Sequence, residues 1–283
     1  MPPPSLWSLA LTPAGDPSFD ASIAALTLLQ ALLVTTPRAL SLPALARFRS
    51  GWWAILPALS VVGFVFGVEA LSGAADGLTY LALFAVPPLA ALALGAGIRG
   101  ARGWLVPAAA LLFVLAWIDR GGLAGEAAAV VLEALSCVTL GVLWVAVTPR
   151  ALVKLGILAM AAADLWLVAS TRLNAPNNAL NNVVPVAHLP QLQSALLGSA
   201  VMGYGDLFVA ALLGALLASN PRLAVRGALV AAGVGLALDL LFFVVDELPA
   251  TASIALTLLI LEAWERWARR PASPRKRERE LAV

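Results

Sequence analysis

Nine apolar stretches, separated by short polar segments, make up most of the chain. A helix needs about 20 apolar residues to cross the hydrocarbon core of a bilayer, which is about 30 Å thick. Because lipid offers no hydrogen bonds, the backbone there must pair its own polar groups, and a helix does this. The pattern therefore predicts an all-α polytopic membrane protein with nine transmembrane helices. The predicted spans are residues 21–36, 52–71, 78–97, 104–118, 127–147, 153–170, 194–218, 228–245 and 249–264.

The composition favours a membrane protein over a soluble one. Of the 283 residues, 61% are hydrophobic and 12% are charged, whereas soluble domains contain about 25% charged residues. The single cysteine, Cys137, excludes an internal disulfide, and His188 is the only histidine. A zinc site needs several such ligands, and the Gly-x-Ser-x-Gly motif of serine hydrolases does not occur in the sequence. We therefore expect neither a metal nor another cofactor.

The basic residues indicate an orientation, because cytoplasmic loops of membrane proteins are enriched in lysine and arginine. In the nine-span arrangement only Arg120 and Arg172 fall on the opposite side. We therefore expect a multi-pass protein of the cell inner (cytoplasmic) membrane, with its N-terminus outside and its C-terminus in the cytoplasm. The basic tail should contact anionic lipid, and we expect no nucleic-acid partner. The basic residues on the predicted cytoplasmic side are Arg38, Arg47, Arg49, Arg99, Arg102, Arg150, Lys154, Arg222, Arg226, Arg266, Arg269, Arg270, Arg275, Lys276, Arg277 and Arg279.

Two aspartates are predicted at matched depth in consecutive spans. Asp164 lies about ten residues beyond the basic flank of span six, and Asp206 lies about twelve residues from each end of span seven. At about 1.5 Å per residue, both positions reach the middle of the membrane. Carboxylates at that depth are costly and usually functional. Because spans six and seven run antiparallel, we expect the two carboxylates to face one another.

Four further acids lie within the predicted spans. Glu69 and Glu262 are close to span ends, where their side chains can reach water. Glu133 and Asp239 are each about two turns inside a span. The sequence leaves open whether Glu133 and Asp239 take a direct part in function or pair with polar neighbours.

An aspartate pair can hydrolyse a peptide bond without a metal or a covalent intermediate. Two carboxylates a few ångströms apart share a proton. The ionised carboxylate can deprotonate a water, and the protonated one can give its proton to the leaving amide. Gly205, beside Asp206, leaves space for an extended substrate backbone, and small residues such as Gly203 and Gly214 allow close helix packing. The pair therefore favours an intramembrane aspartic endopeptidase.

Three segments resemble a known family of such proteases. Residues 203–206, Gly-Tyr-Gly-Asp, match the Gly-x-Gly-Asp motif of the presenilin and signal peptide peptidase family. That family has nine spans, with an aspartate in the sixth, Gly-x-Gly-Asp in the seventh and Pro-Ala-Leu at the start of the ninth. Here Asp164 occupies the first position, and Pro249 and Ala250 begin the third motif. The chain resembles a bacterial or archaeal member, with the orientation of the signal peptide peptidase branch.

The resemblance implies a substrate and a division of the chain. The substrate would be a single-pass transmembrane peptide or protein, locally unwound, and Asp164 and Asp206 would be catalytic. An extracytoplasmic segment (1–20) and helices one to five (21–152) would precede the catalytic helices six to nine (153–264) and the basic cytoplasmic tail (265–283). The residues implied to bind substrate are Gly203, Tyr204, Gly205, Pro249, Ala250 and Thr251.

Some positions depart from the family pattern, and other functions fit part of the sequence. Ala163 stands where the family usually has tyrosine, and the third motif reads Pro-Ala-Thr, with Thr251 last. Prepilin peptidases also carry Gly-x-Gly-Asp, but they usually have a lysine soon afterwards, where this chain has Phe208. Carboxylates within the membrane also serve proton- or cation-coupled transporters. A relative that binds membrane helices without cleaving them is a third alternative. No feature of the sequence sets the oligomeric state.

Overall fold

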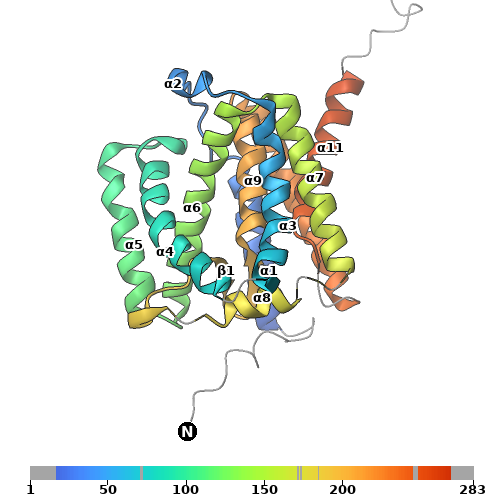
Figure 1. The fold of residues 1–283 in the computed structure, drawn as a ribbon. Coiled ribbons are helices and arrows are strands. Elements are labelled where there is room, and N and C mark those ends of the chain that lie inside the picture. The colour runs from blue at the N-terminus through green and yellow to red at the C-terminus, as the bar shows by residue number, and fades with distance from the viewer. Residues whose placement is uncertain are drawn as a thin grey trace, which may run out of the picture.

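Helices form nearly all of the regular structure (Figure 1). A computed structural model describes residues 17–70, 73–170, 172, 174–183, 185–244 and 248–268. Most of the N-terminal segment and of the basic tail therefore lies outside the described residues. The helices are α1 (Pro17–Leu33), α2 (Pro43–Ala46), α3 (Ile55–Ala70), α4 (Ala74–Leu92), α5 (Val106–Ile118), α6 (Leu123–Val147), α7 (Arg150–Ala169), α8 (Asn174–Asn181), α9 (Tyr204–Leu217), α10 (Pro221–Asp239) and α11 (Thr251–Ala268), and the strands are β1 (Ser194–Leu197) and β2 (Ala200–Gly203).

The all-α class predicted from the apolar pattern is confirmed. Within the described part of the chain, each predicted span contains one helix of 13 residues or more. Four helical stretches there have the length and apolar composition needed to cross a membrane: Ala74–Gly97, Leu123–Val147, Arg150–Ala169 and Pro221–Phe243. The protein therefore has the character of a membrane protein.

Helix α9 is the centre of the packing. Every residue from Leu207 to Leu217 is buried, and α9 contacts α1, α6, α7, α10 and α11. Figure 1 shows α9, in orange, between α6 and α7. Helices α4 and α5 pack beside α6, at the edge of the molecule. Protein rather than lipid therefore surrounds α9, and residues on α9 meet an environment set by other side chains.

Glycines allow the helices to approach α9 closely. A Cβ atom added to Gly141 of α6 would lie 2.9 Å from the Ala211 carbonyl oxygen. A Cβ added to Gly214 of α9 would lie 2.5 Å from the Leu33 carbonyl oxygen at the end of α1. Both distances are too short for a real side chain. Small residues serve this purpose in membrane helices, where close backbone contact replaces the hydrophobic effect as the source of stability.

We expect Gly214→Ala to destabilise the fold, because the new methyl group must push α1 away from α9. Overpacking of this kind costs about 1–3 kcal/mol, which corresponds to a fall in Tm of roughly 2–10 °C. Gly233→Ala is the matched control, since a Cβ at Gly233 of α10 meets no atom within 4 Å. Thermal unfolding in detergent should show Gly233→Ala at or above the wild-type Tm. Equal Tm values for the two variants would contradict the packing argument.

The prediction of a continuous helix over residues 194–218 is wrong. Its first ten residues form an antiparallel hairpin in which Ser194 pairs with Gly203 and Leu197 pairs with Ala200. Gly198 at the turn has a φ of +58°, a conformation that glycine adopts without strain. The hairpin satisfies backbone polar groups between its strands, and α9 begins only at Tyr204. Asp206 is therefore the third residue of a helix and not the midpoint of one.

Candidate active site

Asp164 and Asp206 come together near one end of the α7, α9 and α11 bundle. Asp164 lies five residues before the end of α7, and Asp206 is in the first turn of α9. These helices contact each other and α11, which starts at Thr251. The two carboxylates interact electrostatically. The predicted pairing therefore occurs, but at helix ends that adjoin the β1–β2 hairpin.

Thr251 contacts both carboxylates. Its hydroxyl donates a hydrogen bond of 2.5 Å to Oδ2 of Asp164. Its backbone N–H interacts with the Asp164 and Asp206 carboxylates. Thr251 is buried, so water does not compete freely for these bonds. The first residue of α11 is thus hydrogen-bonded to Asp164 and adjoins Asp206.

The start of α9 fixes Asp206. The Gly203 backbone N–H donates to Oδ2 of Asp206 over 3.1 Å, as in a capping box at a helix N-terminus. A carboxylate is favoured there because the N-terminal end of a helix carries positive partial charge. Asp164 and Asp206 therefore each accept a hydrogen bond through Oδ2.

The two glycines of the Gly-x-Gly-Asp segment differ in their surroundings. A Cβ at Gly203 would lie 3.0 Å from Oδ2 of Asp206, which is tighter than an ordinary van der Waals contact. A Cβ at Gly205 would meet no atom within 4 Å. Gly203 thus lets the carboxylate approach the backbone, and open space lies beside Gly205.

If the aspartate pair cleaves peptides, as proposed below, the two alanine substitutions should have different kinetic signatures. Gly203→Ala should displace the Asp206 carboxylate by a few tenths of an ångström and lower kcat by about threefold to thirtyfold, because catalysis is sensitive to sub-ångström placement. Gly205→Ala should chiefly raise KM by narrowing the space next to the acid. Peptide-cleavage kinetics measure both, with Gly233→Ala as the control. An unchanged KM for Gly205→Ala would show that this space does not receive substrate.

Three other residues that the family resemblance implies to bind substrate are Tyr204, Pro249 and Ala250, and they are held by different neighbours. The Tyr204 hydroxyl forms a 2.7 Å hydrogen bond with Oγ of Ser136 on α6, so it is engaged away from the carboxylates. Pro249 is buried just before α11. The Ala250 carbonyl accepts from Oγ of Ser253 at 2.8 Å. The structure therefore brings the Pro-Ala-Thr segment to the aspartates mainly through Thr251.

Gln30 of α1 is a site residue that the sequence reasoning missed. Its Nε2 donates to the Asp206 carbonyl oxygen at 3.2 Å and to the Ala250 carbonyl oxygen at 3.3 Å. Its Oε1 accepts from Oγ of Ser253 at 3.2 Å. Gln30 is buried and joins α1, α9 and the start of α11. The available signal was a lone amide in an otherwise apolar predicted span.

The other acids do not join the pair. Both carboxyl oxygens of Glu133, on α6, are buried without a hydrogen-bond partner, as is Oδ2 of Asp239. Glu262 forms an ion pair with Lys154 between α11 and α7. The side chain of Glu69 lies outside the described part of the structure. Within that part no group of three or more histidine, cysteine, aspartate or glutamate side chains is placed to hold a metal ion.

Comparisons with models of known protein families, with curated proteins and with solved structures found no match to this chain.

Proposed function

We propose that the protein is an intramembrane aspartyl protease that hydrolyses peptide bonds within transmembrane segments. The observation that carries this proposal is the pair of Asp164 and Asp206 carboxylates, which come from neighbouring helices and interact electrostatically, with the Thr251 hydroxyl donating to Asp164. Paired carboxylates with one proton between them are suited to acid–base hydrolysis. Asp206 also begins a helix that is surrounded by protein, which keeps the pair out of lipid.

The chemistry needs one ionised and one protonated carboxyl group. The ionised aspartate takes a proton from water as the water oxygen attacks the carbonyl carbon of the peptide. The protonated aspartate gives its proton to the amide nitrogen as the C–N bond breaks. Thr251 and the Gly203 N–H are positioning groups, because each fixes one carboxylate through Oδ2. The substrate backbone must be unwound to reach this point, and the space beside Gly205 is where it would enter.

The proposal extends to topology and family. We propose that all nine of the longer helices cross the cell inner membrane, with the N-terminus outside and the basic tail in the cytoplasm, and that residues 153–264 form the catalytic unit. The match between nine apolar stretches and nine helices in the described residues supports this. The order Asp164, Gly-x-Gly-Asp and Pro-Ala resembles the presenilin and signal peptide peptidase family. The substrate would be a single-pass membrane helix.

A proton-coupled transporter is the second candidate, and Glu133 favours it. Its carboxyl group is buried in α6 with no hydrogen-bond partner, and it interacts electrostatically with Tyr204, two residues before Asp206. Buried acids in series are a feature of proton pathways in membrane proteins. A transporter would carry protons across the membrane of sealed vesicles without cutting any peptide.

One reconstitution experiment separates the two functions. The full chain is placed in sealed vesicles with a helical membrane peptide, and the peptide is analysed by mass spectrometry beside an Asp206→Ala control. A protease produces new peptide termini that the control lacks. An acid-dependent flux with an intact peptide would instead support the transporter. Capture of the peptide with neither cleavage nor flux would indicate a protein that only binds membrane helices.

A further inference from the structure

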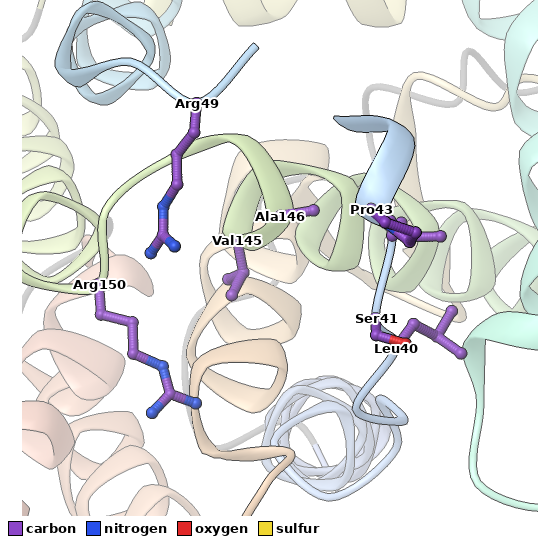
Figure 2. A pocket seen from close by; sticks show the side chains of 8 residues that line it. Leu40, Ser41, Pro43, Arg49, Val145, Ala146 and Arg150 are labelled. Atoms are coloured by element: carbon purple, nitrogen blue, oxygen red, sulfur yellow. The ribbon is translucent and has the colours of Figure 1, made fainter. Parts of the chain in front are cut away.

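A pocket lies at the C-terminal end of α6, away from the two aspartates. It has a volume of about 440 Å³ and lies where the chain between α1 and α3 passes the corner between α6 and α7. Figure 2 shows its lining side chains. They include Ser41, Pro43, Arg49, Val145, Ala146 and Arg150. None of the residues that line this pocket is acidic, so two guanidinium groups set its charge.

The two arginines differ in how they are held. Arg150, the first residue of α7, donates from Nη2 to Oγ of Ser219 at 2.9 Å, which fixes its guanidinium group. Arg49 makes no hydrogen bond or ion pair with another described residue. A guanidinium group has five N–H donors in a planar fork. Most of the guanidinium donors around this pocket therefore have no acceptor among the described residues, and this would suit an anionic oxygen ligand.

We propose that this pocket, the Arg49–Arg150 pocket, binds the phosphate of an anionic membrane lipid headgroup. Guanidinium forks match phosphate oxygens in geometry and charge. The apolar lining, from Pro43 and Val145, suits the glycerol and first methylene groups of a lipid better than it suits a free ion. The α6 C-terminus carries negative partial charge, and two full positive charges outweigh it.

The surroundings of the pocket favour a lipid as the source of the phosphate. Phe48 and Trp52, which flank Arg49 in sequence, are 55% and 79% exposed. Exposed aromatic residues beside arginines are typical of the headgroup layer of a membrane. Anionic headgroups are concentrated on the cytoplasmic surface, where basic segments attract them. In the topology proposed above, on which this inference rests, the pocket lies on the cytoplasmic side, where a lipid phosphate would be available.

The test measures lipid retention by the full-length protein in neutral detergent. Native mass spectrometry would follow the binding of phosphatidylglycerol, with phosphatidylcholine as the neutral lipid. The variants are Arg49→Gln, Arg150→Gln and the double substitution. Arg102→Gln is the matched control, because it also removes one exposed arginine but does not line the pocket. We expect the affinity of the double variant for phosphatidylglycerol to fall by about tenfold or more. The affinity of the control should stay within about twofold of the wild-type value.

Three results would overturn the proposal. Retention by Arg102→Gln as low as that by the double variant would mean that diffuse charge alone attracts the lipid. Complete displacement of the lipid by inorganic phosphate at equal concentration would make free phosphate the ligand. Equal retention of the two lipids would exclude anion recognition. If the double variant fails to fold, Arg49→Gln alone still tests the proposal. Arg49 makes no hydrogen bond or ion pair with another described residue, so its substitution should leave the fold intact.

Discussion

Converting either Asp164 or Asp206 to asparagine is expected to reduce cleavage of a membrane peptide by about a thousandfold or more. General acid–base catalysis contributes about 10²–10⁴-fold for each group, and the two carboxyl groups act as one unit, so either loss disables both proton transfers. Asparagine keeps the size of the side chain. It can still accept from Thr251 or the Gly203 N–H through its oxygen, so the fold should persist while activity is lost.

Glu262→Gln is the control for this prediction. Glu262 is also an acid of the α7–α11 contact, where it pairs with Lys154, but it lies eleven residues along α11 from Thr251. A partly exposed ion pair contributes about 1 kcal/mol or less, so Glu262→Gln should cleave at nearly the wild-type rate. Initial rates measured by mass spectrometry test all three variants, with Tm recorded for each. Substantial cleavage by either asparagine variant would refute the two-aspartate mechanism.

Thr251→Val is expected to lower kcat by about 10- to 150-fold with little change in KM. Valine has nearly the shape of threonine but lacks the hydroxyl that donates to Oδ2 of Asp164. A hydrogen bond to a charged group is worth about 1.5–3 kcal/mol, and each 1.36 kcal/mol is a tenfold change in rate. The loss falls on kcat because Thr251 orients a reacting group, whereas a residue that only binds substrate would change KM.

Thr251→Ser is the comparison that separates the effect of losing the hydroxyl from the effect of losing the methyl contact. Serine keeps the hydroxyl and loses the methyl group, so its kcat should return to within about threefold of wild type. Both variants retain the backbone N–H that interacts with the two carboxylates. If valine and serine reduced kcat equally, the methyl contact would matter and the hydroxyl would not. Unchanged kcat in both would remove Thr251 from the positioning groups.

The sequence predicted the helices well because apolar length is a strong signal. Each of the nine stretches contains a helix in the described residues, and the ends differ by only a few residues in most cases. Span one was predicted over residues 21–36 and is observed as Pro17–Leu33. The pairing of the two aspartates was also expected, because antiparallel spans six and seven were predicted to bring them to the same depth, although Asp206 lies at the start of α9 and not at mid-span. These features depend on local pattern and chain order alone.

The hairpin was not predictable from apolar length. Residues 194–203 are small or apolar, so they extended the seventh span without interruption. The signals for strands were weaker: Gly198 could form a turn, and Gly203 and Gly205 disfavour a helix. The interpretation of Asp206 changed as a result. Its carboxylate is stabilised by a helix N-terminus and by the Gly203 N–H, and it does not interrupt a helix at its centre.

Contacts between distant segments could not be predicted from pattern either. Gln30 touches the Asp206 and Ala250 carbonyl oxygens, and no periodicity in one helix reports a partner in another. Thr251 first appeared as a departure from the Pro-Ala-Leu motif. In the structure its hydroxyl donates to Asp164, so the departure supplies a hydrogen-bond donor that leucine lacks.

The hydrogen bonds of Gln30 can form only late in the synthesis of the protein. It reaches partners 176 and 220 residues further along the chain, and the second set arrives only with the start of α11. Helices emerge and dock in order from the N-terminus. A chain that has been translated only through α10 contains both aspartates but lacks the Thr251 hydroxyl that donates to Asp164. If the protein is the protease proposed above, it would therefore remain inactive beside other newly inserted helices until its own last helix is in place.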